Sequence, residues 1–260
     1  FSYSPVGDVD GVEKNMEIQS NPEGSIADVA RVSALCNDAK IVGRAPEAPE
    51  DSAEAGKKKK KNKDADTEKD YERVGEPTEA ALCVLAEKLG GTGADSGKSV
   101  ESMLPSELAA ANVDTWRTSN PRSATLEFSR DRKSMSVLCR GDGGSEGNRL
   151  FVKGAPNLLL ERCTHVKFRD GTVSRLSGAL RREIEEKTTE LAVRPLRCLA
   201  LAIKEEQDLD GSLQDYFPDE ESDRAHPLLS DPSNFRDIET GLTLVGIVGI
   251  KDPARPEVAD

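Results

Sequence analysis

Residues 125–156 decide the fold, and they read TLEFSRDRKSMSVLCR, then GDGGSEGN, then RLFVKGAP. Thr125–Phe128 is a short extended run, and Lys133–Cys139 alternates polar and apolar residues as a strand does. The polar residues 129–132 between them predict a turn. Arg149–Lys153 predicts a third strand. The apolar face of the second strand would hold Met135, Val137 and Cys139.

The ends of these strands carry an aromatic ring beside several cations, a set that suits a ligand with a flat π-face and an anionic tail. A nucleotide is such a ligand, because ring stacking contributes about 1–3 kcal/mol per base in single-strand binders, and Arg and Lys hold phosphate. Gly154 breaks the third strand, and Pro156 suits the start of a helix. The residues at the strand ends are Phe128, Arg130, Lys133 and Lys153.

The composition sets the broad class. The chain has 260 residues, at the upper end for one domain, and 36% of them are hydrophobic and 32% charged. Its net charge of -12 makes it a poor general binder of nucleic acid, so a phosphate site must be a local basic patch. The longest apolar run, Leu242–Ile250, is too short to span a bilayer. Five cysteines without a CxxC pair predict reduced, cytosolic thiols.

Residues 76–90 form the clearest predicted helix. Pro77 suits its first turn, Glu76 and Glu79 favour the N-terminal end of its dipole, and Gly90 ends it. The buried stripe of this helix would consist of Ala81, Leu82, Leu85 and Leu89.

Other elements are predicted on both sides of this region. A helix begins at Ser25, with Ser25 and Asp28 as a capping pair. Leu196–Lys204 and Leu242–Ile250 have the apolar density and the length of buried strands. Gln207–Arg236, which separates them, predicts a long acidic loop.

Residues 44–69 are charged, of low complexity and without apolar anchors, which predicts a disordered insertion. Its lysine run, Lys57–Lys61, could form a patch for nucleic acid, calmodulin or lipid. The acidic residues that flank it and the lack of interleaved aromatics favour a solvated loop. Residues 252–260 are proline-rich and predict a hinge after a domain over 1–251, in a chain cut from a larger protein.

Five separated segments stand in a fixed order: VGEPTEAAL (74–82), FSRDRKSMSV (128–137), FVKGAP (151–156), RCLALA (197–202) and VGIVGIKDPAR (245–255). Together they resemble the nucleotide-binding domain of P-type cation pumps, and the second is most similar to the form in sarco/endoplasmic reticulum calcium pumps. The resemblance covers nearly the whole chain apart from the insertion. It implies an α+β fold, an antiparallel sheet of about six or seven strands flanked by helices.

The resemblance also implies a role for individual residues around the base. Phe128 would stack on adenine, with Leu199 covering the ring nearby. Glu79 would reach the adenine amino group. Lys153 and Gly154 would line the inner pocket.

On the phosphate side, the resemblance implies that Arg130, Lys133 and Arg197 meet the phosphates. Glu76 would approach the Mg²⁺ that arrives with ATP. Thr78 would help to shape this wall of the site.

The sequence contains none of the family's DKTGT, TGES or DGxND motifs, so no residue of this chain is expected to be catalytic. The resemblance implies a monomeric domain that holds ATP while the γ-phosphate passes to an aspartate of a neighbouring phosphorylation domain, which drives calcium transport into the reticulum lumen. Its partners would be ATP or ADP and the pump's phosphorylation and actuator domains, at the cytosolic face of the reticulum membrane, without nucleic acid or direct membrane contact. Ala254 departs from the family's DPPR hinge.

Several alternatives were weighed. A Walker-like Gly97-Lys98-Ser99 follows a predicted helix, and Thr92 stands where its first glycine is required. Cys163 and His165 lack partners at zinc spacing. Cys198 belongs to the implied pocket as a small hydrophobe rather than a nucleophile. The functional alternatives are another P-type cation pump, a self-contained kinase, which would need a catalytic aspartate loop, and a regulatory domain that works through the lysine run.

Overall fold

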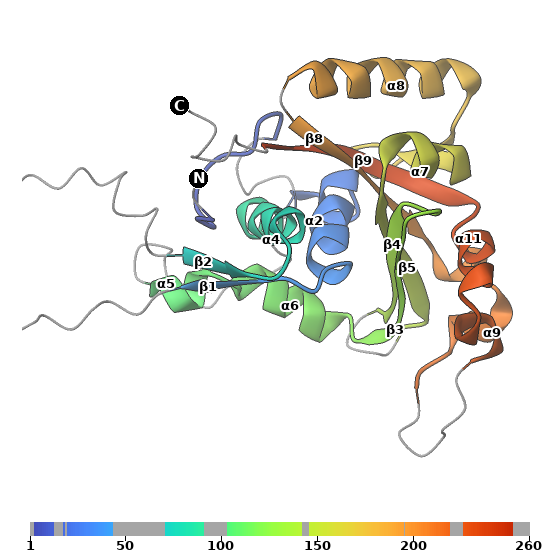
Figure 1. Ribbon diagram of the computed structural model, residues 1–260, viewed down its shortest axis with the longest axis horizontal. Helices are drawn as coiled ribbons and strands as arrows, with labels where there is room; N and C mark the ends of the chain where they lie inside the picture. The colour runs from blue at the N-terminus through green and yellow to red at the C-terminus, as the bar shows by residue number, and fades with distance from the viewer. Residues whose placement is uncertain are drawn as a thin grey trace, which may run out of the picture.

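The central sheet is built from β3 (Arg122–Ser129), β4 (Ser134–Arg140), β5 (Asn148–Gly154), β6 (Cys163–Lys167), β7 (Val173–Arg175), β8 (Leu196–Lys204) and β9 (Leu242–Lys251). Their order across the sheet is β3-β4-β5-β8-β9-β6-β7 (Figure 1). Neighbouring strands pair antiparallel, except that β6 and β9 are parallel. A separate sheet pairs β1 (Lys40–Gly43) with β2 (Tyr71–Val74). The predicted fold, a mainly antiparallel sheet of six or seven strands, is confirmed.

The computed structural model describes residues 3–12, 18, 20–43, 71–90, 103–141, 146–194, 196–218 and 226–251. Three sequence predictions lie outside these ranges. They concern the lysine-rich insertion at 44–69, the Walker-like tripeptide at 97–99 and the hinge at 252–260.

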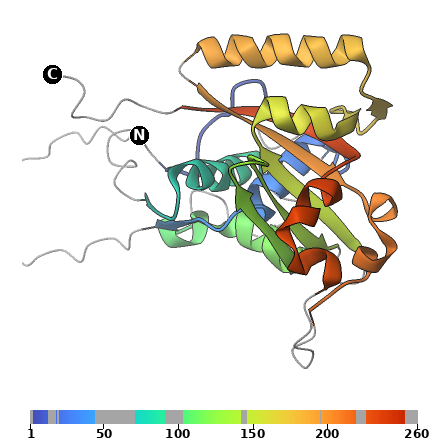
Figure 2. The same ribbon diagram turned by 45° about the vertical axis from the view of Figure 1, so that its right-hand side comes forward.

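Helices cover both faces of the central sheet (Figures 1 and 2). One face is covered by α2 (Ser25–Leu35), α4 (Pro77–Leu89) and α6 (Ala111–Ser119), with the short α5 (Pro105–Leu108) against β1. The other face is covered by α7 (Pro156–Arg162), α8 (Gly178–Val193), α9 (Gly211–Gln214) and α11 (Phe235–Ile238). The short elements α10 (Pro227–Ser230), η3 (Glu206–Asp208) and η4 (Pro232–Asn234) complete the described chain.

Strand alternation divides the interior into two cores, one on each face of the sheet. In β4, Val137 and Cys139 pack with α2 and α4, whereas Leu138 packs on the opposite face. In β5, Phe151 and Val152 divide in the same way. The predicted apolar face of residues 133–139 is therefore confirmed, and both faces of the sheet are covered.

The predicted capping pair at the start of α2 is wrong. The N-cap is Gly24, and within the described residues no side chain caps it. Asp28 is instead buried in an ion cluster, 2.7 Å from Arg31 Nη1 and 2.7 Å from Lys167 Nζ on β6. A carboxylate that faces two cations in the interior gains more there than from a backbone N–H at the helix end.

The predicted bounds of the helix at 76–90 are confirmed, with Glu76 as N-cap and Gly90 as C-cap. Its predicted stripe is only partly correct. Leu82 and Leu89 are buried, but Leu85 is half-buried and Cys83 is fully buried. The reason is that α4 packs against α2, α6 and β1, so more than one side of it is covered.

The expected long acidic loop between β8 and β9 is also wrong in part. The described residues of Gln207–Arg236 include the helical turns α9, α10 and η4 and the start of α11. Leu213 and Phe235 from these turns pack into the core behind the sheet. Isolated apolar residues among acidic ones carry no helical period, so the sequence did not show that this segment covers a sheet face.

Candidate functional site

The ends of β3, β4 and β5 meet beside the middle of β8 at one end of the central sheet. Ser129 on β3 pairs with Ser134 on β4, which pairs with Gly154 on β5, which pairs with Ala200 on β8. This row lies beside the tight turn 130–133 and the first residues of β8. The residues that the sequence grouped at strand ends therefore lie at one end of the sheet. We call this end, where the paired residues form a row across the strands, the row edge.

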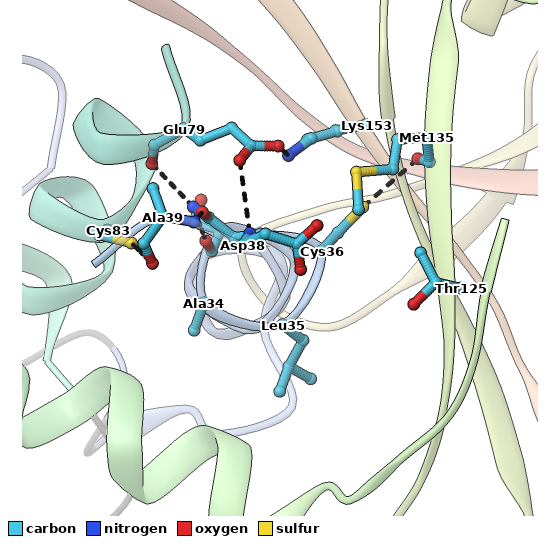
Figure 3. A network of polar contacts seen from close by, with 12 residues as sticks. Ala34, Leu35, Cys36, Asp38, Ala39, Glu79, Cys83, Thr125, Met135 and Lys153 are labelled. Atoms are coloured by element: carbon cyan, nitrogen blue, oxygen red, sulfur yellow. Dashed lines mark hydrogen bonds and ion pairs between the residues drawn. The ribbon is translucent and has the colours of Figure 1, made fainter. Parts of the chain in front are cut away.

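On the α4 side of the row edge, Lys153 and Glu79 form an ion pair. Lys153 Nζ lies 2.6 Å from Glu79 Oε1, and the two side chains are 10% and 19% exposed. Figure 3 shows them pointing toward each other across the space between α4 and β5. The pair is thus within reach of solvent at a place where helix and sheet come together.

The segment between α2 and β1 holds this pair in place from below. The amide of Asp38 lies 3.4 Å from Glu79 Oε2, and Asn37 Nδ2 donates to the backbone carbonyl of Glu79 at 2.7 Å. Cys36 Sγ lies 3.3 Å from the carbonyl of Met135 on β4 (Figure 3). Burial raises the pKa of the Cys36 thiol to about 11, so it is a neutral hydrogen-bond donor here.

Phe128 presents an exposed ring at the same edge, since 60% of its surface is accessible. Ser129 pairs with Ser134, whose hydroxyl points to the opposite face, toward Glu239. The β3–β4 register shifts between Leu126 and Ser129, so Phe128 lies at an irregularity of β3, at the same end of the sheet as Lys153. An exposed large aromatic residue at a strand end is a feature that core packing does not explain.

The turn after Phe128 is fixed tightly. Lys133 has a φ of 47°, a left-handed conformation that is uncommon outside glycine. Its amide donates to Ser129 O at 2.7 Å, and its carbonyl accepts from Ala155 N at 3.0 Å. A Cβ at Gly154 would lie 2.8 Å from that carbonyl, so only glycine allows β5 to approach the turn this closely.

At the start of β8, Arg197 lies against the first turn of α4. Its Nη1 donates to Thr78 Oγ1 at 3.0 Å. Leu199 alternates with Arg197 and Leu201 and is half-buried on this same face. Cys198 points to the other face, where its Sγ is 4.0 Å from Thr188 O on α8, and partial burial raises the pKa of its thiol.

The sequence-predicted site residues thus fall into three groups. Direct contacts join Glu79 to Lys153, Thr78 to Arg197 and Gly154 to Lys133. The same sheet end also carries Phe128, Arg130, Leu199 and the exposed N-cap Glu76. Cys198 alone is separated from the others by the thickness of the sheet.

Sequence reasoning missed two sets of residues around the site. Asn37 and Asp38 follow α2 as a pair of turn-forming residues, a local signal that could have been noticed. Glu239 had no signal, because it lies outside every predicted element, between the predicted loop Gln207–Arg236 and the predicted strand Leu242–Ile250. Its carboxylate is fully buried against Arg132 and Arg162.

Two further findings concern the described residues only. None of their helices is both long and apolar enough to cross a membrane. They also contain no group of three or more His, Cys, Asp or Glu side chains that could hold a metal ion.

The structure defines an α+β class of protein, with a seven-stranded, mainly antiparallel sheet covered by helices on both faces. The chain matches the family described as "P-type ATPase, cytoplasmic domain N" over residues 25–257. Because this match covers most of the chain, the chain belongs to that family.

Individual relatives are whole pumps. The chain is 35% identical over 244 residues to "Calcium-transporting ATPase 2, endoplasmic reticulum-type" of Arabidopsis thaliana, covering 92% of this chain and 20% of the relative. It is 33% identical over 244 residues to "Probable calcium-transporting ATPase" of Trypanosoma brucei brucei, with the same two coverages. The chain is also 33% identical to "Calcium-transporting ATPase 4, endoplasmic reticulum-type" of Arabidopsis thaliana, covering 88% of this chain and 18% of the relative. The chain thus spans about a fifth of the length of these relatives.

Proposed function

We propose that this chain is the ATP-holding domain of a P-type calcium pump of the endoplasmic reticulum type. One observation carries the proposal: the exposed ring of Phe128 lies at the same end of the sheet as the Lys153–Glu79 pair. A flat ligand can stack on the ring there while its polar edge meets a carboxylate. The printed names of the relatives support calcium as the transported ion.

The base contacts follow from this placement. Adenine stacks on Phe128, and Leu199 covers the ring from β8. The carboxylate of Glu79 accepts a hydrogen bond from the adenine amino group, while a base with an oxygen at that position would repel it. Lys153 orients Glu79 through their ion pair, and the missing side chain at Gly154 leaves room beside the turn.

The phosphate contacts come from the turn and from β8. Arg130 and Lys133 are exposed on the turn next to Phe128. Arg197, which donates to Thr78, can give a further N–H of its fork to a phosphate oxygen. Glu76 is exposed at the N-cap of α4, and its carboxylate suits the Mg²⁺ that accompanies ATP, because Mg²⁺ prefers oxygen ligands.

The chemical contribution of this chain is positioning. The γ-phosphate passes to an aspartate outside the chain, in the phosphorylation domain of the pump, and residues 252–260 form the hinge toward that domain. Holding the base and the α- and β-phosphates in one geometry converts the transfer into a step between prearranged groups. In the pump, the domain lies on the cytosolic side of the reticulum membrane, with the actuator and phosphorylation domains as its partners.

A chemical-shift titration of the 260-residue chain with ATP tests the proposal. Amide shifts are expected to change around the three contact pairs of the row edge and in the turn 130–133. Adenosine should move the signals of Phe128 and Glu79 but leave Arg130 and Arg197 largely unmoved. No response at the row edge, or a response confined to α8, would contradict the proposal. Steady hydrolysis of ATP by the chain alone would indicate a self-contained enzyme instead.

A further inference from the structure

A second set of charged residues lies on the opposite face of the sheet, directly behind the row edge. Its centre is Glu239, which follows α11 and is 0% exposed. Its carboxylate accepts from Ser134 Oγ at 2.6 Å and from Ser136 Oγ at 2.7 Å. It pairs with Arg162 Nη1, and Arg132 Nε lies 3.4 Å away. We call these five residues the Glu239 cluster.

The two arginines of the Glu239 cluster fasten the backbone of the turn that carries the candidate phosphate ligands. Arg132 Nη2 donates to Leu126 O at 3.2 Å, to Ser134 O at 3.1 Å and to Glu127 O. Arg162 Nη2 donates to the carbonyl of Arg132 itself at 3.1 Å. The guanidinium groups thus bridge both strands of the β3–β4 hairpin just before and just after its turn.

Arg132 and its neighbour Lys133 point in different directions. Arg132 points inward to Glu239, whereas the next residue, Lys133, is exposed in its left-handed conformation. That conformation is unfavourable for a lysine, so the surrounding structure must enforce it. The Ser129 and Ala155 backbone contacts hold Lys133 from two sides, and the Glu239 cluster holds Arg132 immediately before it.

Three charged groups are a costly way to fill a protein interior, since apolar side chains of similar volume usually stabilise a core equally well. Burial lowers the pKa of the Arg132 guanidinium, and the charge of Glu239 opposes that shift. The ring of Phe235 on α11 lies 5.1 Å below the same guanidinium. What these charges provide and apolar groups cannot is directed donation to four backbone carbonyls of the hairpin.

We propose that Glu239, Arg132 and Arg162 are positioning residues for phosphate binding, which hold the β3–β4 turn so that Lys133 and Arg130 face the phosphates of the nucleotide. This inference rests on the proposed function. The residues touch no nucleotide themselves and act through the turn. They lie on the opposite face of the sheet. Glu239 is 105 positions along the chain from Ser134, whose hydroxyl donates to it.

The test compares adenosine with ATP in the full chain, using Glu239→Gln. The ratio of the two dissociation constants measures the phosphate contribution, and this ratio is expected to fall about tenfold, the size of one charge-assisted contact. Adenosine affinity should fall less than ATP affinity. Glu79 lies outside the cluster, and the cluster reaches Phe128 only through the carbonyls of Leu126 and Glu127 that Arg132 holds. The Cα chemical shift of Lys133, which reports its left-handed backbone, should move without any nucleotide present.

Asp28→Asn is the matched control, because Asp28 also sits in a buried ion cluster, with Arg31 and Lys167. Asp28→Asn should lower stability. It should leave unchanged both the ratio of the adenosine and ATP dissociation constants and the Cα chemical shift of Lys133. If Glu239→Gln does not fold, Ser136→Ala replaces it, since that change removes one hydroxyl hydrogen bond to the Glu239 carboxylate and keeps both arginine side chains. A folded variant with an unchanged ratio and an unchanged Lys133 shift overturns the inference, as does an equal effect of Asp28→Asn. If the wild-type chain binds neither adenosine nor ATP, the proposed function is refuted. The Cα chemical shift of Lys133 in Glu239→Gln would still show whether the Glu239 cluster holds the turn.

Discussion

Glu79 and Glu239 lie on opposite faces of one end of the same sheet, and each is paired with cations from other elements. Glu79 is 19% exposed and meets one lysine, whereas Glu239 is 0% exposed and meets two arginines and two serine hydroxyls. The chemistry of the two carboxylates is alike, and their surroundings differ. The difference teaches that access to solvent, more than residue type, distinguishes Glu79, the carboxylate proposed to meet a ligand, from Glu239, which is enclosed by protein donors.

The physical reason lies in hydrogen-bonding capacity. A carboxylate has about four acceptor positions, and Glu239 uses three of them on Ser134, Ser136 and Arg162 inside a core. Glu79 receives Lys153 on one oxygen and only a long contact from the Asp38 amide on the other. Glu79 can therefore accept another donor at low cost, whereas Glu239 cannot without breaking a buried ion pair.

The strongest test of this comparison is the same substitution at both positions. Glu239→Gln should lower the free energy of unfolding by about 3–5 kcal/mol, because it leaves two buried guanidinium groups without their counter-charge. Glu79→Gln should lower it by less, because it leaves one lysine at a partly exposed site without a counter-charge, rather than two buried guanidinium groups. Urea unfolding measures both values. Equal losses at the two positions would remove the distinction.

The next largest effect is expected on nucleotide binding when Phe128, the residue proposed to stack on the base, is changed. Phe128→Ala should weaken ATP and ADP by a similar amount, about 1–3 kcal/mol, because both share the base that stacks on the ring. Stability should change little, since the ring is 60% exposed. Calorimetric titration with each nucleotide provides the comparison. Unchanged affinity would refute the stacking role and leave Glu79 without its neighbouring ligand surface.

A smaller effect is expected at Arg197, which separates phosphate contacts from base contacts on the same face. Arg197→Ala should weaken ATP about tenfold and adenosine hardly at all, because a guanidinium contributes one charge-assisted contact to phosphate. The ratio of the two affinities is the measurement. Arg175→Ala, on the exposed strand β7 at the far end of the sheet, is the control and should leave the ratio unchanged. Equal losses for both ligands would count against a phosphate role.

The smallest effect is expected for residues 46–68, which belong neither to the proposed site around Glu79 nor to the Glu239 cluster. Deletion of residues 46–68 should leave ATP affinity within about twofold of the intact chain. The segment has no apolar anchors in its sequence, and it joins β1 to β2, which pair with each other directly. The same calorimetric titration is sufficient. A large loss would show that the insertion contributes to the site.

Much of the fold could be predicted from sequence because its signals are local. The β3–β4 turn, the start of α7 at Pro156 and the start of α4 at Pro77 depend on residues within a few positions of each other. The expected role of Asp28 failed for the opposite reason. Its partner Lys167 lies 139 positions away, and such a contact leaves no periodic pattern.

The candidate site shows the same division. Phe128, Lys153 and the other strand-end residues were found because an aromatic ring beside cations is unusual in a chain with 4% aromatic residues. Cys198 was grouped with them by proximity to Arg197, but adjacent strand residues point to opposite faces. Asn37 and Glu239 became visible only through contacts with Glu79 and Ser134.

The sequence by itself predicted the central strands β3, β4, β5, β8 and β9, the helices α2 and α4, the resemblance to the family and the residue types available for a nucleotide site. Only the tertiary structure decided which of those residues face each other. Lys153 and Glu79 are 74 positions apart, and Arg197 and Thr78 are 119 apart. Local patterns arise from neighbours within a turn or a strand, whereas such distant pairs, and the exposure that distinguishes Glu79 from Glu239, depend on how whole layers pack.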